Sequence, residues 1–193
     1  MNKKTFAFLS LLFITAIIYG QEKIGNKLYL YGNLENSVKG KTLIFYGVDD
    51  PKGEIKIIER FKDNGIESIS WNKLFIPGYS YSDIEKNEII NNKGIQTIIF
   101  IKLNSRSTYN QSSSNTSYNS WTNSFNTYGT SGNVIGNVGL VFEIYNIDNG
   151  FNKPIAVING NADNSWGAAG SQRGVTLKVV DRVLNAMKKE KAY

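Results

Sequence analysis

The residues that could carry chemistry in this chain are aromatic rings and carboxylates, because its 193 residues include no histidine and no cysteine. The absence of histidine removes the commonest general base and the commonest metal ligand. The absence of cysteine removes disulfides, thiol nucleophiles and thiolate metal sites. No GxxxxGK[ST] or GxGxxG phosphate-binding motif is present. We therefore identify no catalytic residue, no metal ligand and no cofactor.

The carboxylates supply the remaining acid–base groups, and a hydrolase would need two of them across one cleft. Nothing in the sequence pairs Asp49, Asp50, Asp163 or Glu143. Asp49 and Asp50 could bind a hard cation. Because Asp50 precedes Pro51, however, the pair is more typical of a helix N-cap followed by a first-turn proline. A carboxylate-dependent hydrolase acting on envelope polymers stays as an alternative.

An aromatic series lies in the insert 104–133, which consists mostly of serine, threonine and asparagine. Tyr118, Trp121, Phe125 and Tyr128 are spaced three, four and three residues apart, so a helix would place them on one stripe. On a strand they would not share a face, and serine, threonine and asparagine are weak helix formers. We expect a mobile arm that binds a glycan, a membrane interface or a partner protein. The alternative is a solvated spacer.

A second aromatic candidate is Trp166, which lies between small polar residues in the segment 163–167. A tryptophan in such a loop could line a pocket for a sugar or a peptide. Packing of the ring onto the core is the alternative, and we give it more weight.

The first 20 residues are typical of a secretory signal peptide. Lys3 and Lys4 precede the apolar run Phe6–Tyr19, which is shorter than the ~20 residues that span a bilayer. The alternative is an uncleaved anchor. We expect an exported protein, periplasmic or extracellular, with no transmembrane segment after cleavage and, without a cysteine, no lipid anchor.

The elements that position these residues begin with a central strand at Ile95–Leu103, which is apolar and rich in β-branched side chains. Helix signals start at Asp50 and at Ser82, whose spacing to Glu85 is that of a capping box. We expect these helices to end at Gly65 and Gly94. In the first helix, apolar residues at helical spacing are Ile55, Ile58 and Phe61. Further strands are predicted at Lys27–Gly32, at an edge, and at Lys41–Val48 and Ile66–Trp71.

The last third predicts a hairpin and a closing helix. The strand Val138–Asp148 is followed by an Asp-Asn-Gly turn and the returning strand Lys153–Asn159. We expect a loop over 160–174. The closing amphipathic helix presents an apolar face and ends in lysines that suit the negative end of its dipole, with core positions Leu177, Val180, Leu184 and Met187. We therefore expect no nucleic-acid partner.

This order of elements predicts an α/β fold with a mixed β-sheet, helices packed on it and a Ser/Asn/Thr-rich insert. Residues 21–193 form a single domain. The segment 91–103 (NNKGIQTIIFIKL), the insert, the segment 140–163 (LVFEIYNIDNGFNKPIAVINGNAD) and the basic C-terminal helix follow one another in an order that resembles small exported envelope proteins of unknown function, many of them lipoproteins. The resemblance covers the chain from Lys41 to its end. Their architecture is similar to domains of curli-secretion and penicillin-binding-protein-activator lipoproteins. The lipid-bearing cysteine of those lipoproteins is absent here.

Together these features predict an exported, non-enzymatic cell-envelope protein that binds an envelope protein or glycan through its insert. The alternatives are the hydrolase and a structural assembly subunit. The net charge of +6 favours solubility and identifies no partner.

Overall fold

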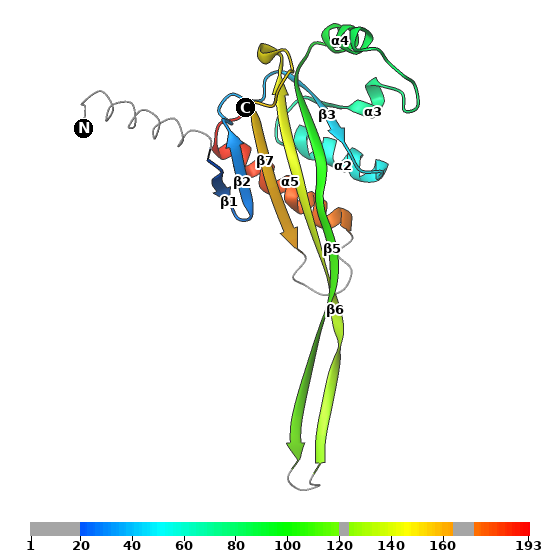
Figure 1. The fold of residues 1–193 in the computed structure, drawn as a ribbon, viewed down its shortest axis with the longest axis vertical. Helices are drawn as coiled ribbons and strands as arrows, with labels where there is room; N and C mark the ends of the chain where they lie inside the picture. Colours follow the sequence, from blue (N-terminus) through cyan, green and yellow to red (C-terminus); the bar gives the residue numbers. More distant parts are fainter. Residues whose placement is uncertain (1–19, 120–123, 164–171) are drawn as a thin grey trace, which may run out of the picture.

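The structure is a computed structural model that describes residues 20–119, 124–163 and 172–193, with the backbone alone over 108–135. Its described strands form one seven-stranded mixed sheet in the order β1-β2-β7-β6-β5-β3-β4 (Figure 1). The strands are β1 (Glu22–Gly25), β2 (Leu28–Gly32), β3 (Lys41–Tyr46), β4 (Ser68–Ser70), β5 (Ile95–Asn119), β6 (Ser124–Asn146) and β7 (Ala156–Asp163).

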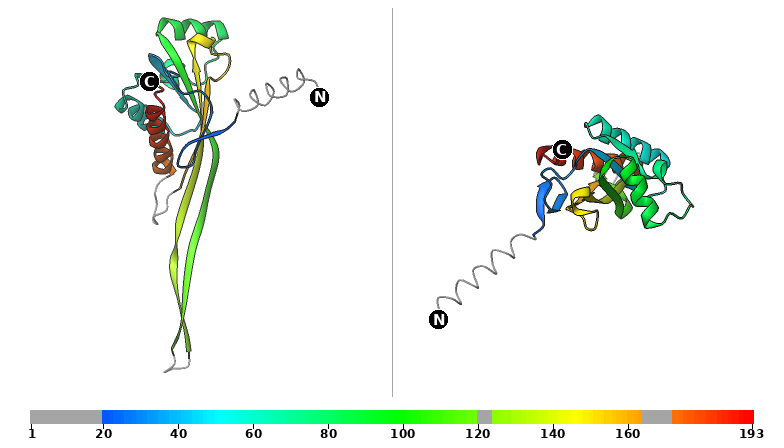
Figure 2. Two further views of the ribbon diagram at one scale, coloured as in Figure 1. Left: turned by 90° about the vertical axis from the view of Figure 1, so that its left-hand side faces the viewer. Right: turned by 90° about the horizontal axis from the view of Figure 1, so that it is seen from above.

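Helices cover both faces of the sheet (Figure 2). One face packs against α2 and α5 and forms the larger apolar cluster. The other face packs against α3 and α4 around a smaller, aromatic cluster. The helices are α2 (Pro51–Asp63), α3 (Trp71–Leu74), α4 (Asp83–Asn92) and α5 (Gln172–Lys189), with a 3₁₀ turn, η1 (Ile147–Asn149). The predicted α/β class with a mixed sheet is confirmed.

The strand β5 lies inside the sheet as expected, next to the middle strand β6. It runs parallel to β3 and antiparallel to β6, and β3 is parallel to β4. Parallel neighbours follow from the helices in the connections, because a tight turn can join antiparallel strands only. The prediction that Lys27–Gly32 is an edge strand is wrong, since β2 lies between β1 and β7. Trp71 begins α3 rather than ending a strand.

The predicted helix ends are confirmed in detail. The Asp50 carboxylate accepts a hydrogen bond of 3.0 Å from the Gly53 amide, which caps α2. Ser82 and Glu85 form the reciprocal capping box of α4. The glycines after α2 and α4 have positive φ, +83° at Gly65 and +65° at Gly94. Local hydrogen-bonding chemistry therefore fixes where these helices start and stop.

The buried faces of the helices follow the sequence pattern except at Leu177 of α5, which is half-buried, and at Ile55 of α2. Val180, Leu184 and Met187 of α5 are fully buried against the sheet. In α2, Ile58 and Phe61 are buried, but Ile55 is 55% exposed and Ile57 takes the buried position. Because all four residues are isoleucine or phenylalanine and lie within one short run, their spacing did not decide which of them face the core.

The hairpin of β6 and β7 differs from the prediction at its far end. Val138, Leu140, Phe142 and Ile144 face the core as expected. However, β7 continues through Gly160 to Asp163, where a loop was expected. The glycine fits because its missing side chain leaves room for Val179 of α5, which a Cβ would approach to 2.9 Å.

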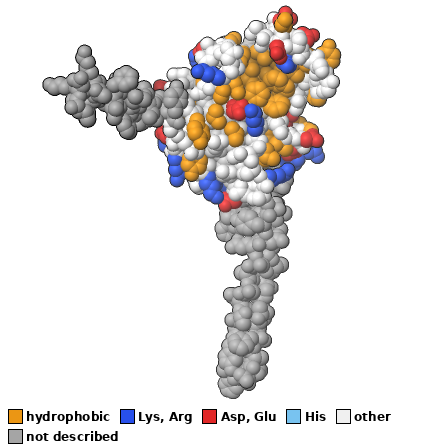
Figure 3. Space-filling view, viewed as in Figure 1, with side chains coloured by type: hydrophobic (Ala, Val, Ile, Leu, Met, Phe, Trp, Pro, Cys, Tyr) orange, Lys and Arg blue, Asp and Glu red, His pale blue; other side chains and the backbone are white. Residues whose placement is uncertain are grey.

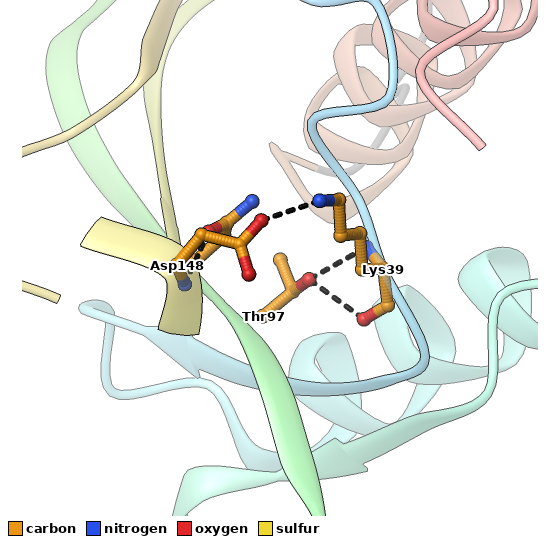
Figure 4. Close-up of polar contacts among 4 residues, drawn as sticks. Lys39, Thr97 and Asp148 are labelled. Carbon is orange, nitrogen blue, oxygen red and sulfur yellow. Dashed lines mark hydrogen bonds and ion pairs between the residues drawn. The ribbon is translucent and has the colours of Figure 1, made fainter. Parts of the chain in front are cut away.

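Thr97 of β5 fixes the connection that leads into β3 (Figure 4). Its hydroxyl accepts a hydrogen bond from the Lys39 amide and donates one to the Lys39 carbonyl, both at 2.8 Å. The Lys39 ammonium pairs with Asp148 of η1. Three segments far apart in sequence thus meet at the end of the sheet near η1.

Candidate functional site

The most distinctive feature of the molecule is a ribbon that projects from the sheet (Figure 1). Among the described strands, β6 loses its second neighbour β7 beyond Asn137, and β5 loses β3 beyond Ile101. From there the two strands pair with each other alone. We call residues 108–119 and 124–136 the ribbon arm and the rest of the described chain the head. At ~3.3 Å per residue the arm is about 40 Å long.

Both edges of the ribbon arm are open. Within the described part of the chain, no third strand pairs with either side of it. An unpaired edge presents a row of backbone N–H and C=O groups that can template pairing with another chain. A two-stranded ribbon without a third strand or a packed helix is also marginally stable in water. A further strand could therefore pair with the open backbone groups of the arm, and this pairing would stabilise the arm.

The composition of the arm leaves these edges unprotected. Natural edge strands are commonly blocked by charged side chains, lysine above all, or by proline. Residues 108–119 and 124–136 contain no lysine, arginine, aspartate, glutamate or proline. The strands that form the sheet edges of the head, β1 and β4, are by contrast four and three residues long. The arm is the long open edge of the described structure.

Two irregularities shape the arm. The β5–β6 register shifts between Leu103 and Ser105, close to where the strands leave the head, and again between Gln111 and Ser113. Such bulges bend a strand pair and increase its twist. They also break the period of two, so alternation in the sequence could not reveal these strands.

The structure places the described part of the insert on two strands, a question that the sequence left open. Tyr118 lies opposite Phe125 in the β5–β6 register, and Tyr128 lies opposite Asn115. The helical stripe, which the weak helix formers around it already disfavoured, does not form, because these three positions are on strands. The pairing of β5 with β6 in the head continues into the arm. Polar residues can therefore form strands there, because the two chains are already aligned. Trp121 and Trp166 lie outside the described residues.

A polar pocket of about 370 Å³ lies at the base of the arm. It opens at the carboxyl end of β3, beside Leu103 and Arg106 of β5, and the carboxyl ends of parallel strands are where open α/β sheets commonly bind ligands. The Arg173 guanidinium donates two hydrogen bonds to the Asp50 carboxylate, of 3.0 Å from Nε and 2.6 Å from Nη2. The polar side chains that line the pocket are Tyr46, Asp49, Asp50, Arg106, Arg173 and Thr176.

The electrostatics of this pocket favour a structural role for Asp50. The hydrogen bonds from Arg173, followed by the one from the Gly53 amide, lower the pKa of the Asp50 carboxyl. A general acid must instead hold its proton near neutral pH. Burial, opposed by a hydrogen bond with Thr176, raises the pKa of the Tyr46 hydroxyl. The pair of Asp50 and Arg173 therefore joins the start of α2 to the start of α5.

Asp49 lines the same pocket as Asp50. The other two acidic residues considered as hydrolytic groups, Asp163 and Glu143, lie elsewhere and are paired. Asp163 contacts Lys27 at 2.9 Å, and this contact lowers the pKa of the Asp163 carboxyl. Glu143 contacts Lys102 at 2.7 Å. Among the described residues, no three histidine, cysteine, aspartate or glutamate side chains are grouped as metal ligands.

Sequence reasoning missed the pocket residues Tyr46, Arg106, Arg173 and Thr176. Arg173 is 123 positions from its partner Asp50 and falls in a stretch predicted as loop. No local motif links the two, so the contact depends on how α5 lies against α2.

No family model and no curated protein matches the chain. Two similar solved structures are both PelC from Paraburkholderia phytofirmans. One, a variant dodecamer, is 12% identical with a TM-score of 0.48 and covers 84% of this chain and 98% of PelC. The other, also a dodecamer, is 12% identical with a TM-score of 0.47 and covers 83% and 98%. Likeness at this level assigns no activity or partner. Within the described residues, no helix has the length and apolar character to cross a membrane.

Proposed function

We propose that this chain is an exported, non-enzymatic protein of the cell envelope that binds a partner protein by strand pairing along its ribbon arm. Export is inferred from the signal-like segment 1–20, and the missing cysteine argues against a lipid anchor. The destination is the periplasm or the exterior. The lack of histidine and cysteine, with Asp50 held by Arg173, supports a role without catalysis.

The observation that carries this proposal is the open, uncharged edge of the arm. Backbone pairing with an added strand supplies affinity whatever the side chains are. The arm presents this edge well away from the head, so a partner meets it without displacing the folded core. Serine, threonine and asparagine side chains can add hydrogen bonds beside the backbone ladder.

A second candidate is an assembly subunit, in which the partner is another copy of this chain. Each copy carries one open edge on β5 and one on β6, so the β5 edge of one arm can pair with the β6 edge of the next. A heterologous contact of this kind repeats from copy to copy. The short β1 and β4 edges of the head offer little room for such pairing.

The test compares three forms of the chain expressed in its own cells. The first is native. The second replaces residues 108–136 with Asn-Gly, which joins the cross-strand partners Ser107 and Asn137 by a two-residue hairpin turn. The third keeps the full arm and carries Tyr193→Ser in the head as a control for surface change. Cross-linking followed by mass spectrometry identifies what each form captures.

We expect the native chain and the Tyr193→Ser control to capture the same partner, and the shortened form to lose it while its circular dichroism and unfolding midpoint stay those of a folded head. Capture of another copy supports the assembly subunit. Equal capture by all three forms would make the arm a spacer, and unfolding of the shortened head would place the arm in the core. Single changes Trp121→Ser and Phe125→Ser then test the aromatic positions.

A further inference from the structure

A row of side chains crosses five strands on the face opposite α2 and α5. In the β-sheet register, Tyr31 pairs with Val157, Val157 with Glu143, Glu143 with Phe100, and Phe100 with Phe45. Their neighbours along each strand, such as Leu30 and Ile158, belong to the core under the helices. The row therefore lies on the other face, where it is partly exposed (Figure 3).

The aromatic rings at the β5–β3 end of the row contact one another, while Tyr31 lies at its other end, beyond Val157 and Glu143. The ring centroids of Phe45 and Phe100 are 5.5 Å apart. Trp71 extends the row beyond β3, at 5.8 Å from Phe45 in an edge-to-face arrangement. Tyr145 stands edge-on to Phe100 at 5.5 Å. These contacts hold the rings in fixed orientations, so their exposed parts form a rigid surface.

A hollow of about 400 Å³ continues the row past Trp71. Phe45, Trp71 and Tyr81 line it together with the segment 76–80, in which Ile76 and Tyr79 are among the most exposed large apolar side chains described. Asn72 and Lys86 add polar groups to its wall. A concave aromatic site with a few polar groups is the usual form of a small-ligand site.

The charges on this face are already paired. Lys102 and Glu143 contact each other at 2.7 Å, and the Tyr145 hydroxyl donates to Glu143 at 3.1 Å. Lys86 contacts Asp83 at 3.1 Å. The surface therefore carries little net charge for attracting a polyanion or a polycation. It instead offers hydrogen-bonding groups between aromatic rings.

The backbone of this face is also occupied. In the row, β7, β6, β5 and β3 each have a strand neighbour on both sides, so an extended peptide cannot join the ladder there. Contact must be made through ring faces, amides, hydroxyls and the paired charges. A sugar ring matches this set, because its C–H faces lie flat on aromatic rings while its hydroxyls bond to polar side chains.

We propose that the aromatic row from Tyr31 to Trp71 and the hollow beside it bind a neutral carbohydrate chain. Five strands at ~4.8 Å spacing make the row about 20 Å wide, which accommodates several sugar rings in line. The ligand class follows from the rings, the paired charges and the absence of a free ladder edge. This site is separate from the ribbon arm, so either proposal can fail without the other.

The test uses the chain without residues 1–20 and with Trp121→Phe and Trp166→Phe, which leave Trp71 as the single tryptophan of the three. Native gels contain hydroxyethylcellulose, mixed-linkage β-glucan, galactomannan or starch as neutral probes, and alginate as an anionic one. Trp71 fluorescence is titrated with the same polymers. The variants are Tyr31→Ala and Phe100→Ala. The matched control is Tyr193→Ala, because Tyr193 and Tyr31 are equally exposed, both at 39%.

We expect at least one neutral polysaccharide to retard the protein and to change Trp71 fluorescence. Tyr31→Ala should weaken this binding roughly two- to tenfold, the range for loss of one aromatic contact, and Tyr193→Ala should leave it unchanged. Tyr31 lies at the surface of β2, so its variant remains informative if Phe100→Ala unfolds. The arm-shortened form should bind equally.

Absence of retardation in every gel, or retardation by alginate alone, would overturn the proposal. Equal binding by the Tyr31→Ala variant and by the protein with Tyr31 in place would also overturn the proposal. A proline-rich peptide array that changes Trp71 fluorescence when no polysaccharide does would identify a peptide surface instead.

Discussion

Thr97 holds the Lys39 backbone with a single hydroxyl that is fully buried. We expect Thr97→Val, which keeps the shape of the side chain, to leave the Lys39 amide and carbonyl without this partner and to lower the free energy of unfolding by about 1 to 3 kcal/mol. Thr97→Ser should lose less, because it retains the hydroxyl. The measurement is urea unfolding followed by circular dichroism.

The matched control removes the other contact of the same residue. The Lys39–Asp148 ion pair is about half exposed on both sides, so Asp148→Asn should cost less than about 1 kcal/mol. A larger loss for Asp148→Asn than for Thr97→Val would show that the ion pair, and not the Thr97 hydroxyl, holds this connection.

Asp50 combines a helix cap with an ion pair, and two substitutions separate them. Asp50→Asn keeps a capping side chain and removes the charge that binds Arg173, whereas Asp50→Ala removes both and should cost about 1 kcal/mol more. The pKa of Asp50 is lower in the folded chain than in the unfolded one. Its ion-pair contribution is therefore full above the unfolded value of ~3.9 and falls as the pH drops through the folded pKa.

Because folding lowers the pKa of Asp50, the ion pair should stabilise the protein at neutral pH and lose its effect in acid. Urea unfolding at pH 7 should show native protein more stable than Asp50→Asn, and the difference should shrink steadily below about pH 4. A difference that stays constant down to pH 2, or grows in acid, would contradict the role assigned to the Asp50–Arg173 pair.

Among single residues, the sequence revealed those that act on neighbours along the chain. Asp50, Ser82 and Glu85 cap helices that begin beside them, so spacing along the chain was enough. Arg173 and Thr97 act through partners 123 and 58 positions away. No sequence motif marks such contacts, because they exist only once the sheet and α5 are packed.

Among the elements, the contact of α5 with β7 depends on Gly160. A Cβ there would stand 2.9 Å from both Leu28 Cδ2 and Val179 Cγ1. We expect Gly160→Ala to force the helix or the β2 side chain to shift and to lower the free energy of unfolding by about 1 to 3 kcal/mol. The measurement is again urea unfolding.

Gly136 is the comparison site for this change. It lies on β6 at the base of the arm, and a Cβ there would meet no atom within 4 Å. Gly136→Ala should therefore change stability by less than about 0.5 kcal/mol. Equal losses at the two positions would mean that Gly160 matters for strand propensity and not for the approach of α5.

The helices and core strands were predictable because burial leaves a period in the sequence. The hairpin and the closing helix show that period, whereas the strand at Ile95–Leu103 was marked by its continuous apolar, β-branched run. The ribbon arm shows none, since its residues are almost uniformly polar and its register shifts between Gln111 and Ser113. Strand pairing there comes from the head, through continuation of β5 and β6.

At the scale of the whole molecule, the chain combines a packed head with a two-stranded ribbon arm. The α/β class and the order of most elements followed from the sequence. The strand order within the sheet did not, because β2 pairs with β7 across more than a hundred residues. The aromatic row likewise appears only when five strands are placed in register.

The most direct test of the arm as the binding element places one photo-crosslinking amino acid at a time in the full-length chain in its own cells. One position is Asn115, on β5 of the arm. The other is Lys62, on the outer surface of α2 in the head. We predict that irradiation gives a discrete cross-linked species from position 115 and none from position 62. The same species from position 62, with none from position 115, would contradict the account.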